Sequence, residues 1–104
     1  MIPNLSYIEK MSAGDQAFKE KLIGIIQEEL PSEKALYEEH IRNGSFDQRA
    51  LIVHKIKHKV SLLGMEKSYE LTAEYESNLR NGSLEGKEEF DLILDRMITF
   101  IGQL

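Results

Sequence analysis

The chain has 104 residues, 41% of them apolar, which is enough for one buried core but not for two, so we expect a single domain over residues 1–104. Eighteen acidic and 13 basic residues give a net charge of −5, which argues against nucleic-acid binding because attraction to phosphates needs a large basic surface. The chain contains no cysteine, which excludes thiol catalysis and thiolate metal ligands.

The first half of the chain predicts a short helix over residues 4–12 and a long helix over residues 15–43. Asp15 or Ser12 can cap the long helix by accepting from its first backbone N–H groups. Pro31 predicts a kink or a break within it. Apolar residues recur there at steps of three and four: Phe18, Leu22, Ile25, Ile26 and Leu30.

The second half predicts helices over residues 47–63, 66–81 and 86–102. The loop "RNGSFD" offers Ser45 or Asp47 as a cap, and "RNGSLEG" supplies a second glycine-rich break. No segment alternates with a period of two, so we expect no strand. The predicted fold is all-α: an antiparallel (up-and-down) four-helix bundle with a short additional N-terminal helix.

The stretch "VHKIKHKVSLLG", residues 53–64, places His54 and His58 one helical turn apart. Helical spacing predicts that both histidines point away from the buried side of their helix. The residues expected on that buried side are Ile52, Ile56, Val60 and Leu63. Those expected to share the outward side with the histidines are Asp47, Leu51, Ser61 and Met65, with Ala50 and Lys57 flanking it.

Several interpretations of this surface compete, and the simplest is a solvated polar helix face. Two histidines at i and i+4 can share a metal ion, but zinc sites need at least three protein ligands and the neighbouring lysines repel a cation. No Ser–His–acid arrangement indicates hydrolysis. The remaining chemistry is a histidine nucleophile that accepts a phosphoryl group, with a lysine one turn away to neutralise phosphate oxygens.

At these residues the sequence resembles the histidine phosphotransfer (HPt) domain family of two-component phosphorelays. The family pattern Ala-His-x-Leu-Lys-Gly, followed six residues on by a glycine, is matched by Val53-His54-Lys55-Ile56-Lys57-His58 and by Leu63-Gly64. This spacing selects His54 over His58. The resemblance extends to "SAGDQAF", "GSFDQRALIVH", Tyr75-Glu76 and "LRNG", in the family's order.

The resemblance implies that His54 is a phosphoacceptor that exchanges a phosphoryl group with aspartates of response-regulator receiver domains. It implies a phosphocarrier and not an independent enzyme, with a hybrid sensor kinase as a further partner. The receiver supplies the Mg²⁺ and its acidic pocket, so the carrier needs no metal or cofactor of its own. Lys57, Lys55 and His58 are expected to stabilise the phosphoryl oxygens, although Lys55 and Lys59 could equally be solubilising charges. A docking surface around the histidine is expected from Ala50, Leu51, Lys55, Ser61, Leu62 and Met65, although Leu62 and Met65 could instead pack under neighbouring helices.

One residue departs from the family pattern, because His58 stands where the family usually has a small residue. It could crowd the receiver, hydrogen-bond the phosphoryl group or act as a second acceptor. The alternative function is therefore a non-catalytic helical interaction module that uses the same face. The N-terminus lacks a basic stretch followed by an apolar run and no apolar segment could span a membrane, so we expect a cytoplasmic protein. With Met1 at the start and no linker, we expect a free-standing monomer.

Overall fold

The computed structural model describes residues 2–104 and is helical throughout, which confirms the predicted all-α class. Met1, one basis for expecting a free-standing chain, lies outside the described residues. The helices in this part of the chain are α1 (Ser6–Ser12), α2 (Gln16–Asn43), α3 (Phe46–Leu62), α4 (Glu66–Arg80) and α5 (Lys87–Gly102), each within two residues of its predicted ends. None of them is both long and apolar enough to cross a membrane.

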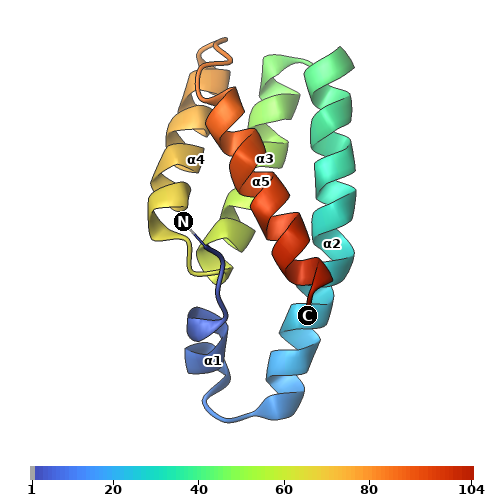
Figure 1. Cartoon of the computed structure of the whole chain (residues 1–104). Helices are drawn as coiled ribbons and strands as arrows, with labels where there is room; N and C mark the ends of the chain where they lie inside the picture. Colours follow the sequence, from blue (N-terminus) through green and yellow to red (C-terminus); the bar gives the residue numbers. More distant parts are fainter. Residues whose placement is uncertain (1) are drawn as a thin grey trace.

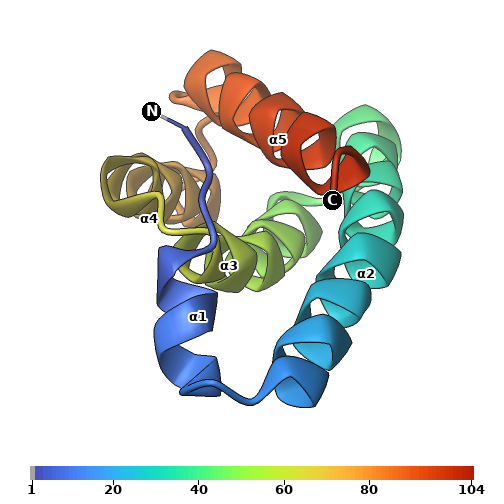
Figure 2. The same ribbon diagram turned by 60° about the horizontal axis from the view of Figure 1, so that its bottom comes forward.

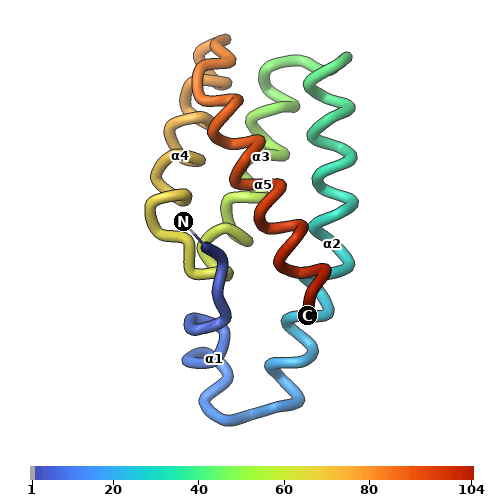
Figure 3. The backbone as a smooth tube through the Cα atoms, viewed as in Figure 1, coloured from blue at the N-terminus to red at the C-terminus, as the bar shows by residue number. Residues whose placement is uncertain are grey.

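The helices are arranged around α3. In Figure 1 the longest helix, α2, extends beyond the other long helices at one end, and α1 lies beside that extension. The view in Figure 2 places α3 between α4 and α2, with α5 running across one side of this row. The tube in Figure 3 follows the chain through the short turns that join these helices. Since α3 packs against both α2 and α4, most extensively against α4, its outward side is confined to a narrow strip.

Local sequence chemistry sets the helix ends. Of the two predicted caps for α3, Ser45 is the one used: its Oγ accepts from the Gln48 backbone N–H, while Gln48 Oε1 accepts from the Ser45 N–H. This reciprocal pair is a capping box. After α3 the chain turns at Gly64 with φ +72°, where a Cβ atom would lie 2.5 Å from the Asn4 side chain. Glycine is therefore required there by both backbone conformation and space.

Of the kink or break predicted at Pro31, the break does not occur, because α2 is a continuous helix from Gln16 to Asn43. Proline removes one backbone donor from the helix ladder. Leu30 and Tyr37 on the two sides of Pro31 are buried in the core, at 0% and 3% exposure. Helices in proteins are stabilised mainly by packing of an apolar face, and this packing holds both halves of α2 in place.

The core contains the predicted buried side of α3, since Ile52, Ile56, Val60 and Leu63 are all buried. The core also includes the charged side chain of Lys59. Lys59 is 8% exposed, and its Nζ donates to Glu29 at 2.9 Å and to Glu33 at 3.0 Å, both on α2. The interpretation of Lys59 as a solubilising surface charge is therefore wrong. Its stem is covered by the α2–α3 contact, and its ammonium group is paired at the edge of that contact.

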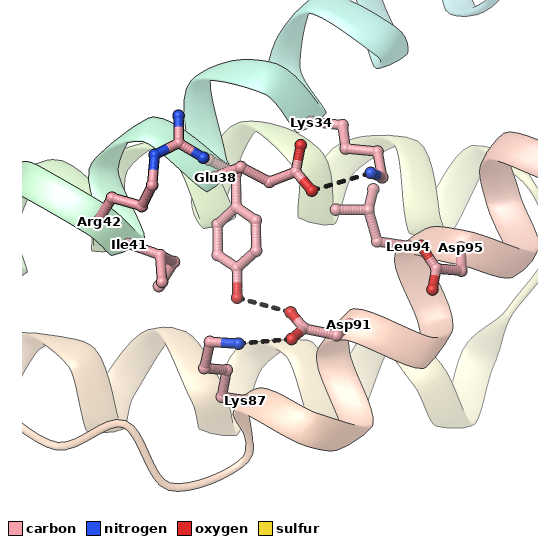
Figure 4. Close-up of a pocket in the computed structure, with 9 residues that line it drawn as sticks. Lys34, Glu38, Ile41, Arg42, Lys87, Asp91, Leu94 and Asp95 are labelled. Atoms are coloured by element: carbon pink, nitrogen blue, oxygen red, sulfur yellow. Dashed lines mark hydrogen bonds and ion pairs between the residues drawn. The ribbon is translucent and has the colours of Figure 1, made fainter.

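A chain of hydroxyl hydrogen bonds joins α2, α4 and α5. Tyr37 donates to Asp91 Oδ1 at 2.9 Å, and the hydroxyls of Tyr37 and Tyr75 are 2.8 Å apart. Burial, together with the hydrogen bond that Tyr37 donates to Asp91, raises the pKa of Tyr37, so its hydroxyl stays protonated. A pocket beside this chain contains Asp91 paired with Lys87, and Lys34 paired with Glu38 (Figure 4). Each of these ion pairs lies within one helix, so the hydrogen bond from Tyr37 to Asp91 is what links α2 to α5 at this pocket.

Ser45→Ala should lower the free energy of unfolding by about 1 kcal/mol, because the first turn of α3 loses the side-chain acceptor of its capping box. For a domain of this size that corresponds to a fall of about 5 °C in Tm, measurable by thermal unfolding followed by circular dichroism. Ser32→Ala, at an exposed position inside α2, is the matched control and should leave Tm unchanged or slightly raised. Equal losses in the two variants would contradict a specific capping role for Ser45.

Candidate functional site

His54 lies on the outward strip of α3 with 46% of its side chain exposed. Its Nδ1 is 3.1 Å and 3.2 Å from the two carboxylate oxygens of Glu76 on α4. An ionised carboxylate can only accept hydrogen bonds, so Nδ1 carries the ring proton and donates it. In the neutral imidazole, Nε2 then keeps its lone pair. The contact with Glu76 thus selects the ring nitrogen that can act as a nucleophile or a ligand.

Glu76 is nearly buried, at 7% exposure, and binds three basic groups. Besides His54, the Nζ of Lys57 lies 2.9 Å away and Arg80 donates to the carboxylate at 2.8 Å. Burial raises the pKa of Glu76, but the hydrogen bonds from Arg80, Lys57 and His54 together outweigh it and hold the pKa below its usual value. The carboxylate is therefore ionised at neutral pH and binds the His54 ring and the cations of Lys57 and Arg80.

His58 lies one turn further along α3, and its Nε2 is 3.3 Å from the Nε2 of His54. The ring centroids are 4.9 Å apart and the ring planes are inclined at 89°, so the two rings approach each other through these nitrogens. Because His54 Nε2 has a lone pair, His58 is the donor in this contact. His58, the residue that departs from the HPt pattern, therefore contacts the unprotonated ring nitrogen of His54.

The lysines of the site differ in their freedom to move. Lys57 has 15% of its side chain exposed and is held by Glu76, with Tyr69 stacked 5.6 Å from its ammonium group. Lys55 is exposed beside His54. Lys57 and Arg80 both pair with Glu76, and Lys55 adds a third positive charge next to His54, so the charged side chains around this histidine carry more positive than negative charge.

The residues predicted to form the docking surface divide into two groups. Leu51 is 59% exposed, and Ser61 and Lys55 are exposed too, as expected of a partner-binding face. Leu62 is partly buried. Leu51 and Lys55 also line a shallow groove between α2 and α3 that reaches His54 and whose α2 side includes Leu36. The groove is mainly apolar around the histidine.

The outward placement predicted for Ala50 and Met65 is wrong, since both are fully buried at 0% exposure. Ala50 is on the flank of α3 that carries Lys57, and α4 covers this flank, as the contact between Lys57 and Glu76 shows. Helical spacing cannot be extended to Met65, because α3 ends at Leu62 and Met65 begins the next helix. Neither residue can contribute to a docking surface.

Two residues of the site escaped the sequence analysis: Glu76, quoted only for its resemblance to the family, and Arg80. The sequence of α4 contains a signal for both residues. Helical spacing puts Glu76 on the same side of α4 as Thr72, Tyr75 and Leu79, and that side is buried. An acid on a buried stripe needs partners, and Arg80 follows at the i+4 spacing suited to an ion pair. The sequence alone does not predict that α4 packs against α3, and this packing brings Glu76 to His54.

Comparisons of the chain with protein-family models, with curated proteins and with solved structures find no match. Among residues 2–104 there is also no group of three or more histidine or acidic side chains placed to hold a metal ion. The functional assignment therefore depends on the geometry around His54.

Glu76→Gln should destabilise the fold by about 1–2 kcal/mol near neutral pH, and the difference from the parent should shrink in acid. The folded-state pKa of Glu76 is depressed, so its stabilising contribution is present above the unfolded pKa of about 4.3 and is lost as the pH falls through the folded value. Urea unfolding at a series of pH values down to about pH 3 measures this. Glu74→Gln, exposed on the same helix, should show no such dependence. A parent–Glu76→Gln difference that stays constant with pH would contradict the depressed pKa.

Proposed function

We propose that this protein is a histidine-containing phosphocarrier of the HPt type, which relays phosphoryl groups between aspartates of receiver domains through phosphohistidine at His54. One observation carries the proposal: buried Glu76 binds His54 Nδ1, which in the neutral ring leaves the lone pair on Nε2, at the exposed edge of α3 where His58 contacts it. A nucleophile oriented by a second group in this way is the general arrangement for covalent catalysis. An exposed acceptor suits a donor that is itself a protein.

The proposed transfer balances without a co-reactant. The lone pair of His54 Nε2 attacks the phosphorus of an aspartyl phosphate, an N–P bond forms, and the acyl P–O bond breaks to release the receiver's carboxylate. The imidazole becomes cationic because Nδ1 keeps its proton, and the negative charge of Glu76 lies 3.1 Å from that nitrogen to stabilise it. The reverse reaction returns the phosphoryl group to another aspartate.

Groups beside His54 are suited to the incoming phosphoryl oxygens. His58 already contacts Nε2, so a small rotation would turn its N–H towards an oxygen on the transferred group. Lys57, which is paired with Glu76, adds a positive charge one helical turn from His54. Lys55 is exposed, and its flexible side chain can bring a second positive charge to the phosphoryl oxygens. The receiver contributes its own Mg²⁺ and most of the transition-state stabilisation.

The same proposal extends to the bundle and its partners. We assign α2 to α5 to an antiparallel four-helix bundle with α1 as an additional helix, supported by the alternating direction of successive long helices in Figure 1. Receiver domains, including that of a hybrid sensor kinase, would dock over His54 and the neighbouring groove that holds Leu36 and Leu51. The apolar side chains of that groove supply contact area around a charged reactive centre.

His54→Gln should abolish phosphoryl acceptance and leave the fold intact, because the side chain is half-exposed and glutamine can still donate to Glu76. We expect a change in unfolding free energy of about 0.5 kcal/mol or less. The measurement is incubation with a phosphorylated receiver domain followed by detection of acid-labile phosphate on the carrier. Glu74→Gln, at an exposed position of α4 outside the groove beside His54, is the control and should label normally. Two results would favour a non-catalytic interaction module instead. One is normal labelling of His54→Gln, and the other is failure of the parent protein to be labelled by any of several receiver domains.

His58→Ala should retain phosphoryl transfer, because the nucleophile and its Glu76 partner are unchanged. A nucleophile moved one turn along the helix would meet the receiver out of line, and a displacement of about 1 Å can already cost a hundredfold in rate. Mass spectrometry of the labelled parent under non-acidic conditions should locate the phosphoryl group on His54. Finding it on His58, or finding that His58→Ala alone eliminates labelling, would overturn the assignment.

A further inference from the structure

The pair of imidazole nitrogens at the site has the spacing of two ligands on one metal ion. The Nε2 atoms of His54 and His58 are 3.3 Å apart. Histidine nitrogens bind Zn²⁺ at about 2.0–2.1 Å, so two of them at a tetrahedral angle lie about 3.3 Å from each other. Both nitrogens are at the exposed edge of α3, and the side chains that carry them are half-exposed or exposed. An ion could therefore reach them from solvent without any rearrangement of the helices.

The surroundings of His54 are those of a metal-binding histidine. Its Nδ1 donates to Glu76, and a carboxylate bound to the remote ring nitrogen fixes the tautomer and raises the basicity of the nitrogen that binds metal. The nearest lysine on the Glu76 side, Lys57, is paired with that carboxylate at 2.9 Å, which reduces its repulsion of a cation. Exposed Lys55 can turn its flexible side chain into solvent.

We propose that His54 and His58 form a two-imidazole site for a transition-metal dication of the Zn²⁺, Ni²⁺ or Cu²⁺ type, with water completing the coordination. Two protein ligands are fewer than the three or more of an ordinary zinc site, so the expected affinity is moderate, increasing from Ni²⁺ to Cu²⁺ in the usual order for nitrogen ligands. Mg²⁺ prefers oxygen ligands and keeps its waters, so it should not compete. The ion replaces the weak hydrogen bond between the rings, because both nitrogens then direct a lone pair at the metal.

The site has a consequence for phosphoryl transfer, which depends on the function proposed above. A metal bound to His54 Nε2 uses the same lone pair that would attack phosphorus, so metal and phosphoryl group exclude each other on this atom. His58, which stands where the resembling family has a small residue, is what makes such inhibition possible in this chain. The inferred role of the metal is therefore that of an inhibitor.

Isothermal titration of the intact protein with Ni²⁺ or Zn²⁺ alone tests the site directly. We expect one ion per chain, and at least a tenfold loss of affinity in His54→Gln and in His58→Gln. Glu76→Gln should weaken binding by about tenfold, the usual effect of removing a carboxylate that orients a metal-binding histidine. His40→Gln is the matched control and should bind as the parent does. Unchanged affinity in His58→Gln would overturn the site and leave the two rings as a hydrogen-bonded pair.

Phosphoramidate separates this inference from the proposed function, because it phosphorylates histidine directly, with ammonia as the leaving group, and needs no receiver. Labelling of the parent should be suppressed by saturating Ni²⁺ and unaffected by Mg²⁺. Labelling of His58→Ala, compared with that variant's own labelling in the absence of metal, should be resistant to the same Ni²⁺ concentration. Metal binding without any labelling of His54 would refute the phosphocarrier and keep the metal site. Labelling of His54 that saturating Ni²⁺ leaves unchanged would refute the inhibition and keep the phosphocarrier.

Discussion

The carboxylate of Glu76 is the group on which the arrangement around His54 depends. A buried charge is costly unless it is paired, and this one is paired with side chains from two helices: His54 and Lys57 of α3, and Arg80 of α4. The contacts that compensate for burial of the carboxylate also fix the tautomer of His54, and they place the positive charges of Lys57 and Arg80 beside the ring. Removal of the carboxylate would leave His54 exposed but without a defined reactive nitrogen.

The helices were predictable because their apolar residues follow one period and their ends carry local chemistry. Ser45 and Gln48 form the capping box within four residues, so the start of α3 could be located without knowledge of the tertiary structure. Pro31 shows the limit of such local rules. It weakens the helix ladder, yet the burial of Leu30 and Tyr37 against other helices keeps α2 continuous.

The site was predictable only as far as a single helix can specify it. Helical spacing places His54 and His58 on the outward side of α3, and the structure has them there. Spacing does not say which neighbouring helix covers a flank, so it cannot predict that Ala50 is buried or that Lys59 is not a surface charge. Glu76 comes from 22 positions further along the chain, so its contact with His54 depends on how α4 packs against α3.

The tyrosine hydroxyls have a directional order that bears on the site. Tyr37 gives its single proton to Asp91, so Tyr75 must be the donor in the contact between the two phenols. Tyr75 is the residue before Glu76. Its hydroxyl holds α4 to Tyr37 of α2, and its ring packs against Phe90 of α5. Because consecutive residues lie about 100° apart around an α-helix, holding Tyr75 in the core also limits the direction in which Glu76 leaves α4 towards His54.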